Sequence, residues 1–328
     1  MMHKTVSKAE HDNINMSTQK IIHLHFMQST YKIAMPDQVY PEFLQLLPSI
    51  LSKLITKGTP PHWDYFINAN YSTPKIELKD NVLTLSSYAS PKQFATDIIL
   101  AASKLLEFEI NKNSIYSIHG AAVAYKNKGF VFLGPYGSGK TTSAINCCLL
   151  DDELNFISGN RLFISKSDII ERIPGINLRK GSIVKEFDGR FNKMLRNSSG
   201  EVWEEKKILL PSEIGLHEQN SYPVSIDTLI VVKKLPREDI VINTNMKDSL
   251  FLMLFESLSV YSDNLPLLFL GGRLPFPSLF SYEDKKARIE FAQALFESTK
   301  IIYIEGQLDN ISHYIIKNII KIDKNEGK

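Results

Sequence analysis

The first third of the chain alternates short apolar runs with polar turns. Apolar residues at every second position predict strands at 21–26, 31–35, 64–69, 75–78 and 82–85. Apolar residues spaced by three and four predict helices at 43–54 and 90–108, the second opened by a Ser-Pro pair. We therefore expect a small α+β domain at 20–112. Residues 1–19 are polar, lack apolar periodicity and are expected to form a disordered leader.

From residue 113 onward the pattern changes to that of an α/β domain, expected to cover 113–328. Two apolar runs at 121–125 and 129–133, separated by a polar turn, predict a hairpin. Further apolar runs and helical spacings predict strands at 155–158, 161–164, 226–232 and 301–304, and helices at 141–150, 248–261, 282–298 and 309–320. Proline and glycine cluster at 265–277, which is expected to be a loop or lid.

Composition narrows the class of protein. Apolar residues make up 43% of the 328 positions and charged residues 23%, as in soluble globular proteins. A net charge of +2 gives no electrostatic reason to expect nucleic acid as a partner. No apolar run approaches the roughly 20 residues that span a bilayer, so no membrane partner is expected. The two cysteines, Cys147 and Cys148, are adjacent, which favours helix packing in a reducing compartment and a cytoplasmic location.

The predicted strand at 129–133 runs directly into a complete G-x-x-x-x-G-K-[ST] motif. Its residues are Gly134, Pro135, Tyr136, Gly137, Ser138, Gly139, Lys140 and Thr141, and Thr142 follows in the predicted helix. Glycines let the backbone turn tightly, so that its amide groups and the helix N-terminus face phosphate oxygens. The lysine then contacts the terminal phosphates and the threonine hydroxyl is placed to ligate Mg²⁺. The motif predicts binding of a nucleoside triphosphate, taken to be ATP, with Mg²⁺ at Thr141.

A histidine and a glycine, His119-Gly120, stand just before the hairpin that leads into this motif. The combination resembles the catalytic domain of HPr kinase/phosphorylase and its relatives, bacterial kinases whose core is similar to that of phosphoenolpyruvate carboxykinase. The resemblance covers 115–320 and implies a P-loop α/β core with a smaller N-terminal α+β domain. It also implies transfer of a γ-phosphoryl group to a hydroxyl, since relatives phosphorylate free serine or a serine of a precursor peptide.

The resemblance places further residues at the site. Segment 156–161 falls where the family has a strand ending in Asp-Asp-Arg or Asn-Asp-Arg, and this chain has Gly159-Asn160-Arg161. The family's first aspartate acts as base, and neither Gly159 nor Asn160 can accept a proton. By their positions in the motif, the resemblance makes His119, Asn160 and Arg161 the candidate catalytic residues, although Asn160 cannot act as a base. Two hypotheses concern the reaction: an ATP-dependent kinase acting on a small molecule or peptide, and a nucleotide-binding regulatory or scaffold protein without kinase activity. A third is that the N-terminal domain binds a peptide or protein at an edge strand within 20–85 and presents it to the site. A homo-oligomer is left open.

Other charged residues are weaker candidates, each with a solvated surface role as the alternative. Three carboxylates are considered as metal ligands: Asp151, Asp152 and Asp227. Three basic residues are considered as phosphate or acceptor contacts: Arg179, Lys180 and Arg273.

Overall fold

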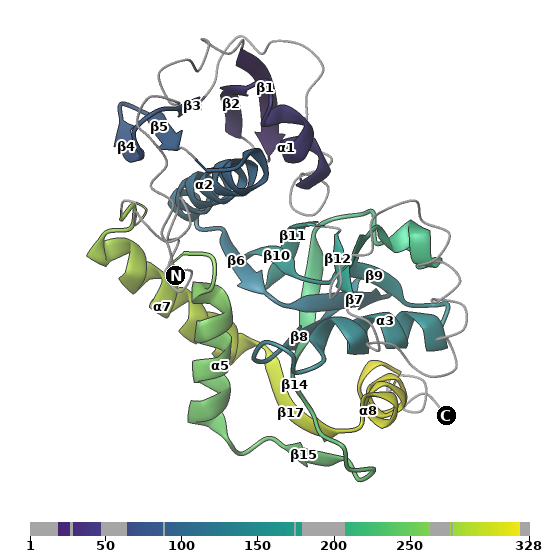
Figure 1. Ribbon diagram of the computed structural model, residues 1–328. Coiled ribbons are helices and arrows are strands. Elements are labelled where there is room, and N and C mark those ends of the chain that lie inside the picture. The colour runs from purple at the N-terminus through teal and green to yellow at the C-terminus, as the bar shows by residue number, and fades with distance from the viewer. Residues whose placement is uncertain are drawn as a thin grey trace, which may run out of the picture. The chain divides into compact units, whose positions relative to one another are not determined.

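The computed structural model describes residues 19–26, 29–46, 64–87, 89–173, 175–178, 207–262, 276 and 278–321. The chain divides into two compact units, and the division falls between Ala102 and Ser103, inside helix α2 (Pro91–Lys112). Each unit is built on its own mixed β-sheet (Figure 1). The expected leader lies outside the described residues apart from Gln19, which begins strand β1, and the expected lid lies outside them apart from Phe276.

The first unit holds a sheet with strands in the order β1-β2-β3-β5-β4. Its strands are β1 (Gln19–Phe26), β2 (Ser29–Pro36), β3 (Tyr65–Tyr71), β4 (Lys75–Lys79) and β5 (Val82–Ser87). The three inner strands are parallel, and each edge strand is antiparallel to its neighbour. Every strand predicted between 21 and 85 is confirmed. The helix predicted at 43–54 is α1 (Tyr40–Leu46), beyond which the prediction lies outside the described residues.

The same tight turn closes two hairpins, one in each unit. Asp80-Asn81 joins β4 to β5 with φ angles of 49° and 63°. Lys126-Asn127 joins β7 (Ala121–Tyr125) to β8 (Lys128–Leu133) with φ angles of 49° and 64°. Two consecutive left-handed residues match the right-handed twist of the paired strands, and asparagine tolerates that conformation well. The predicted hairpin is confirmed, with its second strand beginning one residue earlier than expected.

The second unit is built on a sheet with the order β6-β10-β11-β14-β8-β7-β9. Strand β17 also pairs with β14, and β15 pairs with β17. The strands not yet bounded are β6 (Tyr116–His119), β9 (Asn155–Ser158), β10 (Arg161–Ser165), β11 (Asp168–Ile173), β14 (Val224–Lys234), β15 (Val241–Asn243) and β17 (Lys300–Gly306). A separate two-stranded ribbon consists of β12 (Ile176–Leu178) and β13 (Lys207–Leu209), followed by the 3-10 helix Pro211–Ile214.

Strand β14 is the centre of this sheet and determines where the candidate site lies. It runs parallel to β8 on one side. On its other side it pairs first with β11 and then, from Thr228 onward, with the parallel strand β17. Because β8, β14 and β17 are parallel, their carboxyl ends meet at one edge of the sheet. The carboxyl ends of such strands are where open α/β sheets bind ligands.

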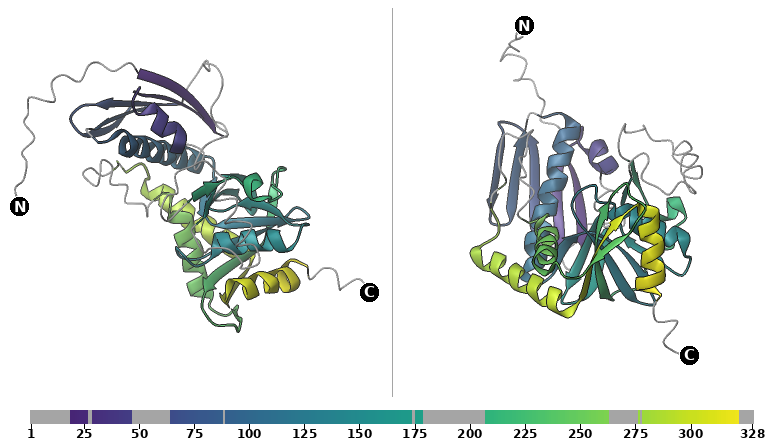
Figure 2. Two further views of the ribbon diagram at one scale, coloured as in Figure 1. Left: turned by 45° about the vertical axis from the view of Figure 1, so that its right-hand side comes forward. Right: turned by 90° about the horizontal axis from the view of Figure 1, so that it is seen from below.

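Helices cover both faces of the sheet around β14 (Figures 1 and 2). On one face, α3 (Lys140–Leu150) and α8 (Leu308–Ile315) contribute to a core with Ile230 and Val232 of β14. On the other face, α5 (Lys247–Ser259) and α7 (Tyr282–Ser298) contribute to a core with Leu229 and Val231. The run of apolar residues at 226–232 therefore reflects a strand buried on both faces. The helix predicted at 309–320 is α8 followed by a π-helical turn, Ile316–Ile320.

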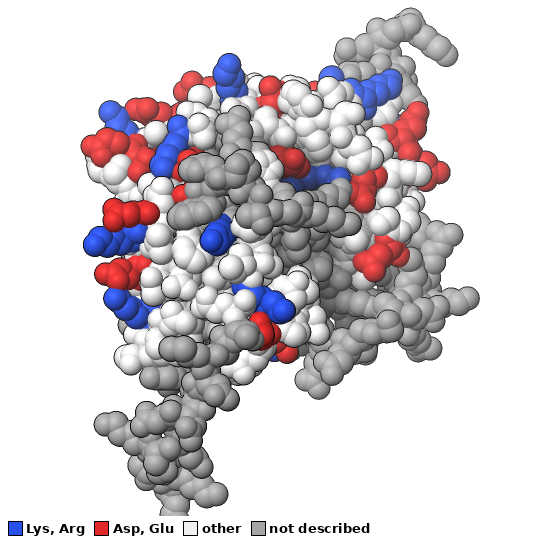
Figure 3. All heavy atoms as spheres, turned by 90° about the horizontal axis from the view of Figure 1, so that it is seen from above, with Lys and Arg blue, Asp and Glu red and all other residues white. Residues whose placement is uncertain are grey.

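The surface carries no dominant charge on the face seen in Figure 3. Lysine and arginine side chains are interspersed there with aspartate and glutamate, and neither sign forms a continuous patch among the described residues. Among the described residues, no helix is both long enough and apolar enough to cross a membrane.

Candidate functional site

The glycine-rich loop (residues 134–139) leads from the carboxyl end of β8 into α3 (Figure 1). Gly134, Gly137 and Gly139 have φ angles of 134°, 79° and 101°, which L side chains rarely adopt. A Cβ atom on Gly134 would lie 2.7 Å from the backbone oxygen of Val232, and one on Gly139 would lie 2.4 Å from Leu308 Cδ2. Glycine is thus required for the positive φ angles and, at Gly134, for close approach to the backbone of β14, whereas at Gly139 the end of the Leu308 side chain could move.

The loop leaves the N-terminus of α3 open to an anion. Gly139 is the N-cap residue, no side chain caps the helix, and the first turn holds no acidic residue. The first amide groups of a helix lack partners within the helix and carry its positive dipole end. The Ser138 hydroxyl is also buried without a hydrogen-bond partner among the described residues. The backbone of Ser138 is held in place, because its oxygen accepts a 2.9 Å hydrogen bond from the amide of Lys234 at the end of β14.

Lys140 folds back over the loop that precedes it. Its side chain is buried, and its ammonium group donates hydrogen bonds to the backbone oxygens of Gly134, at 2.8 Å, and Pro135, at 3.0 Å. Burial lowers the pKa of Lys140 to about 8, because a desolvated ammonium group is less stable than a hydrated one. The ammonium group of Lys140 therefore donates to two carbonyl oxygens of the loop, and a bound phosphate would have to replace them as acceptors.

Thr141 connects the start of α3 to the turn between β9 and β10. Its hydroxyl donates a 2.6 Å hydrogen bond to the backbone oxygen of Gly159. A Cβ atom added to Gly159 would lie 3.0 Å from the methyl carbon of Thr141, which is tighter than nine in ten natural Cβ contacts. A larger residue at 159 would therefore require Thr141 or the turn to shift by a few tenths of an ångström.

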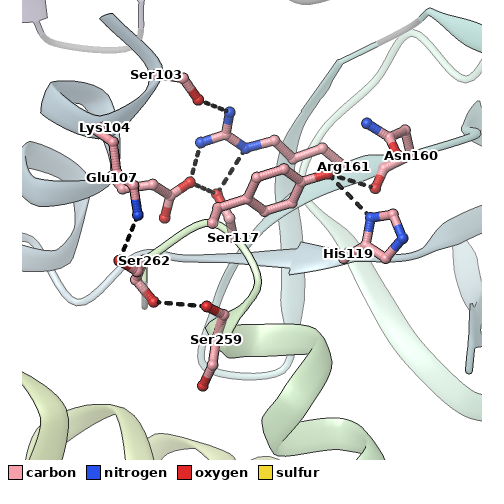
Figure 4. A network of polar contacts seen from close by, with 10 residues as sticks. Ser103, Lys104, Glu107, Ser117, His119, Asn160, Arg161, Ser259 and Ser262 are labelled. Atoms are coloured by element: carbon pink, nitrogen blue, oxygen red, sulfur yellow. Dashed lines mark hydrogen bonds and ion pairs between the residues drawn. The ribbon is translucent and has the colours of Figure 1, made fainter. Parts of the chain in front are cut away.

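His119 and Asn160 lie near each other (Figure 4). Both contact Tyr261, a residue that the sequence pattern did not identify. The backbone oxygen of Asn160 accepts hydrogen bonds from the amide of Gly120 and from the hydroxyl of Tyr261, both at 3.2 Å. Nδ1 of His119 lies 3.1 Å from the same hydroxyl. His119 and Asn160 therefore belong to one cluster, which the Gly159–Thr141 hydrogen bond joins to the start of α3. No motif marks Tyr261, so nothing in the local sequence could have found it.

Arg161 lies in a buried ion pair with Glu107 of α2 (Figure 4). Its Nε and Nη1 atoms donate to the hydroxyls of Ser117, at 3.1 Å, and Ser103, at 2.8 Å, and Ser117 in turn donates to Glu107. Its guanidinium carbon also lies 4.3 Å from the ring centre of Tyr261. In this arrangement the charge of Arg161 is compensated inside the protein, so a contact with a phosphate would require it to leave these partners.

The aspartates considered as metal ligands do not converge on the glycine-rich loop. Asp151 follows the C-terminus of α3 and pairs with Lys321. Asp227 is near the start of β14, the end opposite the loop, where it lies 3.3 Å from the ammonium nitrogen of Lys128. Asp152 is exposed. The described residues contain no cluster of three or more histidine, cysteine, aspartate or glutamate side chains that could hold a metal ion.

The side-chain oxygen that the motif assigns to Mg²⁺, the hydroxyl of Thr141, lies beside the loop at the start of α3. Mg²⁺ is commonly held by one or two protein oxygens together with substrate phosphates and water. The donor set therefore fits an ion that arrives with a nucleotide and does not fit an ion held by the protein alone. The remaining basic candidates, Arg179, Lys180 and Arg273, lie outside the described residues.

Comparison with known proteins finds no family model that matches the chain and no curated protein that matches it.

Proposed function

We propose that the chain binds ATP at the glycine-rich loop, as a P-loop protein of HPr-kinase type, and transfers its γ-phosphoryl group to a hydroxyl of a small molecule or peptide. One observation carries the proposal. A loop with three left-handed glycines joins a parallel strand to an uncapped helix whose first residue is a buried lysine. Amide groups, helix dipole and ammonium group are the elements with which proteins bind a polyphosphate.

Binding would exchange the internal partners of Lys140 for phosphate oxygens. Its ammonium group now contacts the carbonyl groups of Gly134 and Pro135, both within the loop itself. A rotation of the side chain suffices to turn it toward a phosphate, where each hydrogen bond would join two charged groups and be stronger. Thr141 would contribute its hydroxyl oxygen to Mg²⁺, which when bound supplies charge neutralisation at the β- and γ-phosphates.

Transfer would rely on position more than on a strong base. Phosphoryl transfer has a loose transition state, so proton removal from the acceptor is a small part of the barrier. As the acceptor oxygen bonds to the γ-phosphorus, the bond to the β–γ bridging oxygen breaks and ADP leaves. The hydroxyl proton passes to His119, which lies beside Asn160 at the turn that contacts Thr141.

A second candidate function is nucleotide binding without transfer, in a regulatory or scaffold role. It is favoured by the turn between β9 and β10, which has glycine and asparagine where the related kinases have carboxylates. A side chain at Gly159 would also require the methyl group of Thr141 to move by a few tenths of an ångström.

Two measurements test these proposals. Calorimetric titration with ATP and Mg²⁺ should show binding to the wild-type protein and a loss of at least about 100-fold in Lys140→Ala, because charge-assisted contacts are removed. Lys128→Ala is the matched control, since Lys128 lies at the opposite end of β8 and pairs with Asp227. Failure of ATP and GTP to bind the wild-type protein would refute the proposed function.

Transfer is then followed with γ-labelled ATP against free serine, small alcohols and serine-containing peptides. A labelled product that is lost in Lys140→Ala supports the kinase. Tight ATP binding with no labelled product from any acceptor supports the second candidate function.

A further inference from the structure

Tyr261 is a buried tyrosine that touches each of the three candidate catalytic residues. It follows the C-terminus of α5, and its hydroxyl lies 3.1 Å from Nδ1 of His119 and 3.2 Å from the backbone oxygen of Asn160. Its ring lies 4.3 Å from the guanidinium carbon of Arg161 and makes an edge-to-face contact with the imidazole of His119. These contacts come from strands β6 and β10 and the turn before β10, so the side chain of Tyr261 links all three residues.

The protons in this cluster can be counted. A tyrosine hydroxyl has one proton to donate, whereas a backbone carbonyl oxygen can only accept. The hydroxyl of Tyr261 donates to the oxygen of Asn160, so the remaining contact must be a donation from Nδ1 of His119 to the tyrosine oxygen. A neutral His119 with its proton on Nδ1 has its basic lone pair on Nε2.

The surroundings hold Tyr261 in the neutral form and in one place. Burial raises its pKa, so the hydroxyl keeps its proton throughout the physiological range. The cation of Arg161 packs on the ring, and its charge is compensated by Glu107 of α2. The ring cannot turn away without breaking this cation–π contact.

We propose that Tyr261 is a positioning residue that fixes His119 in the tautomer with the proton on Nδ1 and so makes Nε2 the nitrogen that accepts a proton. The tautomer follows from the two hydrogen bonds of the Tyr261 hydroxyl. Its use in taking the proton of an acceptor hydroxyl rests on the proposed function. Tyr261 itself gives up no proton, because its hydroxyl remains bonded to Asn160.

Nitrogen NMR of the full chain tests this directly. Protein labelled with ¹⁵N at histidine is compared with His119→Gln to assign the two ring nitrogens of His119. At a pH where the ring is neutral, we expect Nδ1 to give a pyrrole-like and Nε2 a pyridine-like signal. Tyr261→Phe removes only the hydroxyl, and we expect the two signals to exchange character or to average. The matched control is Tyr222→Phe, since Tyr222 is another tyrosine of the same unit whose pKa is raised by burial and whose hydroxyl donates to a backbone oxygen, that of Gln219.

Each outcome decides the proposal. A pyridine-like Nδ1 in the wild-type protein overturns it, and that spectrum is informative even if Tyr261→Phe does not fold. An unchanged tautomer in folded Tyr261→Phe, or an equal change in Tyr222→Phe, also overturns it. The spectra are recorded without nucleotide, so they are independent of the ATP titration. Absence of ATP binding with the expected spectra would refute only the proposed function.

Discussion

Exchanging Lys140 for methionine removes a buried ammonium group and keeps most of the length of the side chain. In the protein this group is 6% exposed, and its pKa is lowered from 10.5 to about 8 by burial. The folded protein therefore binds this proton less tightly than the unfolded chain does. At neutral pH the burial of the charged lysine is a cost to folding that its two hydrogen bonds offset, and we expect Lys140→Met to unfold at no higher temperature than the wild-type protein while losing ATP binding.

The size of the effect follows from the pKa. A change from 10.5 to about 8 corresponds to about 3 kcal/mol between the two protonation states. The two hydrogen bonds to Gly134 and Pro135 are donated by a charged group and contribute about 1.5–3 kcal/mol each, so their loss offsets this gain in full. We therefore expect Lys140→Met to be no more stable than the wild-type protein at neutral pH.

The pH dependence is a sharper test than the stability at neutral pH. The folded pKa lies below the unfolded value, so the cost is fully present below the folded pKa and disappears as the pH rises through the unfolded value. Between pH 7 and pH 9.5 the wild-type protein should gain about 2 kcal/mol relative to Lys140→Met, so that its advantage in stability grows with pH. Urea unfolding of both proteins across this range measures the difference, in which all other titrating groups cancel. A difference that does not change with pH would refute the reasoning.

Three further changes have defined outcomes. Gly134→Ala and Gly137→Ala both place a side chain at positive φ, but only Gly134 also faces a backbone oxygen, so thermal unfolding should show the larger loss there, by about 2 kcal/mol. Glu107→Ala leaves the cation of Arg161 buried and uncompensated and should cost about 3–5 kcal/mol in urea unfolding, most of which the double change with Arg161→Met should restore. Thr141→Val removes the hydroxyl but keeps the shape, so the stimulation of ATP binding by Mg²⁺ should fall in titrations while Thr141→Ser retains it.

The sequence predicted those parts of the fold in which the local pattern agrees with burial. The apolar run at 226–232 is strand β14, buried on both faces, and the hairpin before the glycine-rich loop has the expected two strands. Strand β11 was not predicted, because Arg172 occupies a buried position in it. Its charge is compensated by Glu218, 2.7 Å away and distant in sequence. Strand β6 was missed for a similar reason, since its buried Ser117 has polar partners on α2 and β10.

In the candidate site, too, only the features carried by consecutive residues could be predicted. The motif predicted a tight loop and a helix that begins at its last residues, and the structure has both. The contacts of that loop with Leu308 and Val232 could not be predicted, because they come from elements far along the chain. Nor could the compensation of Arg161 by Glu107, which depends on the packing of α2 beside β10. A sequence shows chemistry that consecutive residues carry, such as that of the glycine-rich loop. It does not show which distant residue compensates the charge of a side chain such as Arg161.

The packing of α2 has a practical consequence for any attempt to isolate the half of the chain that contains the glycine-rich loop. A fragment cut at residue 113, where the strand pattern of that half begins, would lack Ser103 and Glu107, which lie on its side of the division within α2. Arg161 would then lose its ion pair with Glu107 and its hydrogen bond to Ser103. A fragment starting ahead of Ser103, with the second half of the helix retained, would keep the salt bridge and is the one to express.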